Sequence, residues 1–179
     1  MSTNIEEVKA HLSELGFKFL EKNGYIGLKI TGMPNYTNPE DGKNELFICI
    51  LVVNNGEVVK LVCPHAYKFS NNASSYNKLA LMQTLLQIAY STNLLQLEYD
   101  PDEGEIRVTV DIPIIDSRLT AKQLEFALDC IMHGLDNEHH KIVDAMRHGL
   151  TPESDRERLA AWEEFKKERA NKRRGEFGL

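Results

Sequence analysis

The stretch from Ser75 to His133 constrains the fold more than any other, because its hydrophobic period changes twice along its length. Its first part predicts a long helix whose polar residues leave only a narrow stripe. The apolar residues of this helix are Tyr76, Leu79, Leu81, Met82, Leu85, Leu86, Ile88, Ala89 and Tyr90. A helix that is apolar nearly all round is covered on more than one side. We expect either a helix on a sheet whose far flank is covered by another helix or a partner subunit, or a central core helix of a monomer.

After Asn93 the period becomes two, which is typical of a strand with one buried face. The segment from Leu95 to Tyr99 is followed by the turn sequence DPDEG and then by the alternating return strand IRVTVDI. Thr120 then precedes a second helical pattern, and Gln123 stands three residues later, as in a capping box. The stretch therefore predicts helix, β-hairpin and helix in that order.

The first half of the chain predicts one short helix and two further hairpins. Thr3 and Glu6 have capping-box spacing, and Gly16 closes the helix that they predict. Asn-Gly pairs at 23–24 and 55–56 predict the two hairpin turns. The apolar run LFICILVV predicts a strand that is central or covered on both faces, and Pro64 is expected to stop the strand after it. The polar segment 32–45 is longer than a usual connection and marks either a functional loop or a merely mobile one, of which the mobile loop is favoured.

Beyond Leu135 the sequence predicts one more helix or an extension of the last one, ended by Gly149. Thr151-Pro152 then opens a charged helix with a thin apolar stripe. Runs of antiparallel strands interrupted by helices favour the α+β class. We predict one antiparallel sheet of five to six strands with helices mainly on one face, in the order α-β-β-β-β-α-β-β-α. Residues 1–150 are predicted to form this domain and residues 151–179 a helical tail.

The composition and charge of the chain indicate which partners and which cellular compartment to expect. The 179 residues carry a net charge of −6, which does not favour binding of the whole chain to a polyanion. No apolar run reaches the roughly 20 residues that span a bilayer, so no membrane partner is expected. The N-terminal segment lacks a signal-peptide pattern, and the three cysteines lie in apolar patterns. We therefore expect a cytoplasmic protein with free thiols.

The segments LGFKFLEKNGYIGLKI and LLQLEYDPDEGEIRVTVDIPIIDSRLTAKQLEFALDCIM, in this order of elements, carry a resemblance over residues 3–148. The chain resembles the YbjN-like bacterial family, and it is similar to the type III secretion chaperone fold. The resemblance implies a small acidic cytoplasmic protein, often dimeric, that binds another polypeptide and performs no chemistry. The turn at 23–24 adds one strand to the simple chaperone plan, and the tail from Thr151 has no counterpart in it.

Candidate chemical residues are few. His140, Asp144 and His148 have helical spacing that could hold zinc, but a solvated helix face explains them better. Cys63 stands two residues from His65, although no orienting group for a nucleophilic pair can be named, and a buried cysteine at a strand end is favoured. The glycine-rich nucleotide-binding motifs and the G-x-S-x-G motif do not occur. We predict no catalytic, cofactor or metal site and no enzyme activity.

The leading interpretation is therefore a chaperone- or adaptor-like module that acts as a homodimer and captures a segment of a protein client. An alternative is a nucleic-acid-associated regulator that uses the basic residues between Lys166 and Arg174. The predicted partner-binding residues are Leu81, Leu85, Ile88, Trp162, Phe165, Lys172, Arg173 and Arg174.

Overall fold

The computed structural model describes residues 2–22, 24–39 and 41–149, and the predicted tail lies outside this part of the chain. The element order and the α+β class are as predicted. The elements are α1 (Ile5–Glu14), β1 (Phe19–Lys22), β2 (Tyr25–Thr31), β3 (Glu45–Val53), the short 3₁₀ turn η1 (Asn54–Gly56), β4 (Val58–Lys68), α2 (Ser75–Ser91), β5 (Gln96–Tyr99), β6 (Glu105–Pro113) and α3 (Ala121–His148).

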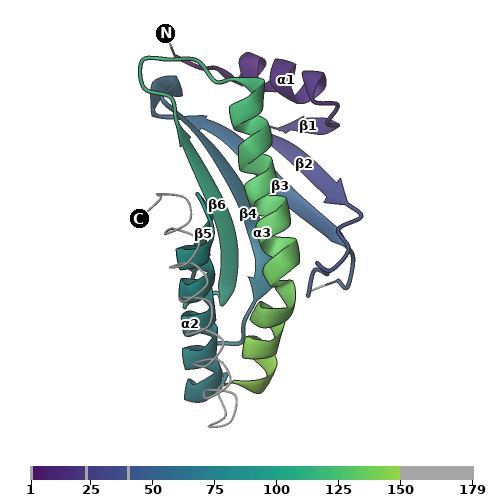
Figure 1. The fold of residues 1–179 in the computed structure, drawn as a ribbon, viewed down its shortest axis with the longest axis vertical. Helices are drawn as coiled ribbons and strands as arrows, with labels where there is room; N and C mark the ends of the chain where they lie inside the picture. Colours follow the sequence, from purple (N-terminus) through teal and green to yellow (C-terminus); the bar gives the residue numbers. More distant parts are fainter. Residues whose placement is uncertain (1, 23, 40, 150–179) are drawn as a thin grey trace, which may run out of the picture.

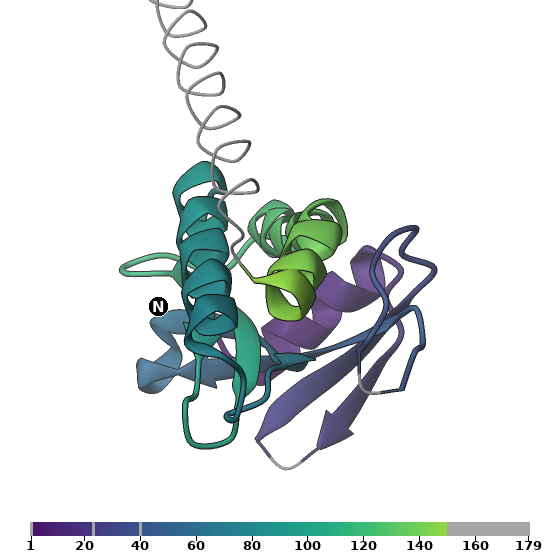
Figure 2. The ribbon, with the colours of Figure 1, turned by 90° about the horizontal axis from the view of Figure 1, so that it is seen from below.

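The six strands form one antiparallel sheet in the order β1-β2-β3-β4-β6-β5. All three helices lie on the same face of this sheet, and α3 crosses its middle (Figure 1; Figure 2). The core fills the space between the two layers. The strands contribute alternate residues to it, such as Leu46, Ile48 and Ile50 of β3. The opposite face of the sheet has no covering element in the described part of the chain, so β3 is central but not covered on both faces.

Beyond Leu135 the sequence allowed either a separate helix or an extension of the preceding one. The structure has the extension, because α3 is a single helix from Ala121 to His148. It runs without a break through Gly134, and a Cβ atom at this position would lie only 2.8 Å from Cδ2 of Leu95. The glycine therefore serves the close approach of α3 to the start of β5. Thr120 and Gln123 form the predicted capping box, and Gly149 caps the other end. No helix in the described ranges is both long and apolar enough to cross a membrane.

Two local predictions are wrong. The N-cap of α1 is Asn4, whose side chain accepts from the backbone N–H of Glu7, whereas the hydroxyl of Thr3 accepts from the backbone N–H of Leu119 at 3.0 Å. Pro64 does not stop β4, because an irregularity between Cys63 and Tyr67 takes the proline out of the ladder and the strand continues to Lys68.

Candidate protein-binding surface

The helix α2 has an inner face in the core and an outer face in solvent. Leu81, Leu85 and Ile88, which were predicted as partner-binding residues, are buried in the core cluster. This part of the prediction needs correction, because buried side chains offer no surface to another molecule. The other five predicted contact residues, Trp162, Phe165, Lys172, Arg173 and Arg174, lie outside the described residues.

The outer face of α2 carries a stripe of large apolar side chains in solvent. Tyr76 is 71% exposed, Leu79 52%, Leu86 70% and Tyr90 62%. Together with the exposed Gln83 they are spaced three, four, three and four residues apart, which is the spacing of a coiled-coil seam. We call these five residues the α2 stripe. The apolar period alone could not separate this stripe from the buried face, because both faces of the helix are apolar.

The α2 stripe stands on a helix that the rest of the domain holds firmly. Ser74 caps its first turn by accepting from the backbone N–H of Asn77, and the hydroxyl of Thr92 donates to the carbonyl of Ile88 at the other end. The side chain of Asn77 donates to the carbonyl of Met146 at 3.0 Å and so ties α2 to the end of α3. The stripe is therefore presented in a fixed direction.

The α2 stripe also lacks charge. The only charged residue within Ser75–Ser91 is Lys78, and its ammonium group donates to the carbonyl of Asn71 at 2.8 Å. Exposed apolar patches on a soluble domain commonly mark sites of protein–protein contact. A charge-free apolar seam is suited to another helix with an apolar face, because no ion has to be desolvated when the two meet.

The loop between β2 and β3 is anchored to α3 by a buried carboxylate. Oδ1 of Asp136 accepts from the backbone N–H groups of Asn35 and Tyr36, both at 2.8 Å, and Oδ2 accepts from the side-chain amide of Asn35 at 3.0 Å. Burial acts to raise the pKa of Asp136, but these hydrogen bonds outweigh it and hold the pKa below its ordinary value. The expectation of a mobile loop therefore fails at Asn35 and Tyr36.

Tyr36 inserts beside the irregular part of β4 and forms an aromatic cluster there. It is fully buried, and its hydroxyl donates to the carbonyl of Ala66 at 2.8 Å. Its ring meets those of Tyr67 and His139 edge-on, and the hydroxyl of Tyr67 lies 3.1 Å from Nδ1 of His139. Burial raises the pKa of Tyr67 and lowers that of His139. The cluster favours neutral, packed rings, which suits a structural role.

Exchanging Tyr36 for phenylalanine should reduce the free energy of unfolding by about 1 kcal/mol, because it leaves the carbonyl of Ala66 without its tyrosine donor. The ring contacts remain in this variant. Urea denaturation followed by circular dichroism measures the loss. The exposed Tyr76→Phe exchange serves as the control and should leave stability unchanged. A wild-type midpoint for Tyr36→Phe would show that this hydrogen bond does not stabilise the fold.

The candidate chemical residues do not assemble into a reactive site. Cys63 is buried, and desolvation raises the pKa of its thiol, whereas His65 is exposed and its backbone N–H donates to Glu105 at 2.9 Å. A buried thiol with a raised pKa beside an exposed imidazole does not favour a nucleophilic pair. Nε2 of His148 lies 3.7 Å from Asp144 on an exposed helix face. The described residues contain no group of three or more side chains placed to hold a metal ion.

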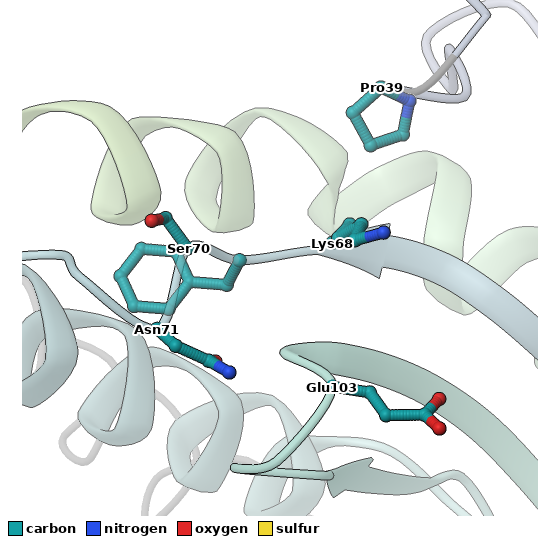
Figure 3. A pocket seen from close by; sticks show the side chains of 6 residues that line it. Pro39, Lys68, Ser70, Asn71 and Glu103 are labelled. Atoms are coloured by element: carbon teal, nitrogen blue, oxygen red, sulfur yellow. The ribbon is translucent and has the colours of Figure 1, made fainter.

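A shallow pocket of about 450 Å³ opens beside the end of β4 (Figure 3). It is lined by Pro39, Lys68, Phe69, Ser70, Asn71 and Glu103. Asn71 comes from the loop before α2, and its amide donates to the carbonyl of Asp102 at 2.7 Å. The lining offers one cation, one carboxylate and no nucleophile with a neighbouring base. The pocket therefore ranks below the α2 stripe as a functional site.

Comparison with known proteins places the fold. No protein-family model and no curated protein matches the chain. Among solved structures it is similar to YbjN from E. coli, which is described as a candidate transcription regulator, with a TM-score of 0.54 and 13% identity over 83% of this chain and 96% of that one. It also matches an uncharacterised protein from Methanothermobacter thermautotrophicus, with a TM-score of 0.47 and 18% identity over 79% and 97%. Neither description mentions a secretion chaperone, so that part of the resemblance stays a prediction. At this identity the first likeness concerns the fold alone, and the chain has a YbjN-like α+β fold.

Proposed function

We propose that the chain is a non-enzymatic, adaptor-like protein-binding module that binds an amphipathic helix of a polypeptide along the α2 stripe. The observation that carries the proposal is the presence of four large apolar side chains, each more than half exposed, at seam spacing on one rigid helix. Helix-in-groove recognition uses this arrangement of anchors on both partners. The predicted client would thus contact Tyr76, Leu79, Leu86 and Tyr90, and not the buried residues beside them.

The energetics of the surface support a specific contact. Fully burying a leucine stabilises a complex by about 1.5–3 kcal/mol, and each side chain of the stripe would contribute part of such a value. Association costs at least about 4 kcal/mol in lost translational and rotational freedom. Four anchors acting together therefore offset this cost, whereas any one of them alone would not. The loss of one central anchor should weaken binding strongly.

The remaining groups support a non-enzymatic role. Titratable side chains with strong pKa shifts, such as Cys63 and Tyr67, are buried in the core. Groups with smaller shifts, such as Glu98 and Arg107, pair with each other nearer the surface of the sheet. Perturbed groups at an active site would instead converge on a pocket. No such convergence occurs among the residues that the structure describes.

The Leu86→Glu exchange should remove helical partners of this module. A tagged full-length protein would be compared with this variant in pull-downs from the cells that make it, at high salt so that weak ionic contacts are screened. Polypeptides held by the wild type should be absent from the variant, because a carboxylate in the seam would have to be desolvated. Both proteins should melt at the same temperature, since Leu86 is exposed.

The matched control is Leu20→Glu. Leu20 is 67% exposed, like Leu86, but it lies on β1 at the opposite edge of the sheet from α2. This control should keep the same polypeptides as the wild type. If both variants keep them, the α2 stripe is not the binding surface and the proposal fails.

A further inference from the structure

The described part of the chain ends beside the first turn of α2, where the α2 stripe begins. The side chain of Asn77 in this turn donates to the carbonyl of Met146 near the end of α3. Gly149, which follows α3, is buried, and a Cβ atom at its position would lie 3.3 Å from the backbone nitrogen of Asn77. The rest of the chain therefore leaves the domain next to Tyr76, the first residue of the stripe.

The sequence that follows encodes a helix of the kind that the α2 stripe is proposed to bind. Thr151 and Pro152 predict the start of this helix. Leu159, Trp162 and Phe165 then recur every three residues on one side of it, and most of the residues around them are charged. The chain thus carries an amphipathic segment of its own directly after the point at which it passes the stripe.

We propose that the tail, residues 151–179, occupies the α2 stripe within the same molecule and covers it until a client displaces the tail. The inference rests on the proposed function, because it adds a regulation to the same surface. In this arrangement Leu159, Trp162 and Phe165 pack against the stripe, and the charged side chains around them stay in water.

The reach and the direction of the tail fit this arrangement. Two residues separate the end of α3 from Thr151, and so short a connection favours a next helix that runs antiparallel to α3. The helix α2 also runs antiparallel to α3, because its start is bonded to the end of α3. A helical segment from Pro152 to Phe165 would extend about 20 Å along α2, and the stripe from Tyr76 to Tyr90 extends about 21 Å.

The covalent link explains why a thin apolar stripe on the tail would suffice. A tethered segment faces its site at an effective concentration on the order of millimolar, so it needs far less affinity than a separate partner. No ion has to be desolvated, because the α2 stripe contains no charged residue. A client must then compete with the tail. A tail that covers the stripe in roughly nine molecules of ten weakens the apparent affinity for the client about tenfold.

The fluorescence of Trp162 tests the contact, because this residue is the only tryptophan of the chain. In the purified full-length protein it should emit at a shorter wavelength, and be quenched less by acrylamide, than in the urea-unfolded chain. Leu86→Glu should remove this protection by placing a carboxylate in the stripe, and its melting temperature should stay that of the wild type because Leu86 is exposed. Leu20→Glu, on β1 at the opposite edge of the sheet, should keep the protection.

A second pair of full-length variants tests the regulation. Phe165→Glu should expose Trp162 as Leu86→Glu does. Because its stripe is intact, however, it should hold more of the client polypeptides in a pull-down than the wild type, by up to about tenfold. Ala160→Glu introduces the same carboxylate on the opposite side of the predicted helix and should behave like the wild type in both measurements.

The contrary results separate this inference from the proposed function. Equal quenching of Trp162 in the wild type, Leu86→Glu and Phe165→Glu would overturn the tail contact, whatever polypeptides the protein holds. Protection that rises with protein concentration would also overturn it, because the tail would then cover the stripe of another molecule. Protection that both variants lose, without any polypeptide held by Phe165→Glu, would support the tail contact and contradict the proposed function.

Discussion

Replacing Asp136 with alanine should lower the free energy of unfolding by about 3 kcal/mol. The carboxylate accepts three hydrogen bonds from Asn35 and Tyr36 in a largely buried position. One hydrogen bond to a charged group contributes about 1.5–3 kcal/mol net, and the contributions of bonds that share one acceptor group are not additive. Alanine also removes the carboxylate to which the backbone N–H of the buried Tyr36 donates. Urea unfolding measures the loss, and limited proteolysis should show new cleavage within residues 32–45.

The pH dependence of this effect follows from the lowered pKa of Asp136. A carboxyl group with a lower pKa in the folded state stabilises the fold at a pH above its unfolded value, which is about 3.9 for aspartate. That contribution is lost as the pH falls through the folded pKa. The difference in stability between the wild type and Asp136→Ala should therefore be full at pH 7 and should shrink below about pH 4.

The partly exposed Asp129 on the same helix provides a control. Its exchange for alanine removes a carboxylate without an anchoring hydrogen bond to the loop, so it should change neither stability nor the cleavage pattern. An equal loss in the two variants would contradict the anchoring role of Asp136. Asp136→Asn should lie between wild type and alanine, because the amide keeps one acceptor oxygen and loses the charge.

The elements that the sequence predicted correctly depend on local signals. Thr120 and Gln123 are three residues apart, and the turn at 55–56 lies directly between its two strands. Such signals need no knowledge of the rest of the chain. The carboxylate of Asp136 instead bonds a residue 101 positions away, and no short-range pattern marks that pairing. The loop was therefore expected to be mobile.

The candidate site could be predicted only in part, for a related reason. The sequence predicted the helix α2, which carries the α2 stripe, as a special one, because a helix that is apolar nearly all round is unusual at a protein surface. It could not assign Leu85 to the core and Leu86 to solvent, since both faces of the helix have leucines and the deciding contacts come from α3. Pro64 shows the same limit, because the irregularity that accommodates it depends on pairing with β6.

The Gly104→Ala exchange should also destabilise the protein by about 3 kcal/mol. Gly104 has a φ of +71°, and a Cβ atom there would overlap with the carbonyl oxygen of Phe69. The same glycine accepts from the backbone N–H of Phe69 at 2.7 Å, so the loop before α2 and the turn before β6 are joined at this point. A left-handed alanine costs about 1–2 kcal/mol, and overpacking adds about 1–3 kcal/mol. Urea unfolding of the full-length variant measures the sum.

Gly42→Ala separates the two contributions to this loss. Gly42 has nearly the same φ, +72°, but a Cβ atom there would meet no atom within 4 Å. The control should therefore show only the backbone cost of about 1–2 kcal/mol, and the difference between the two variants measures the overlap with Phe69. Equal losses would mean that the junction can widen without cost. Since this junction leads into α2, a large excess in Gly104→Ala should be accompanied by weaker binding at the α2 stripe, whereas Gly42→Ala should bind like the wild type.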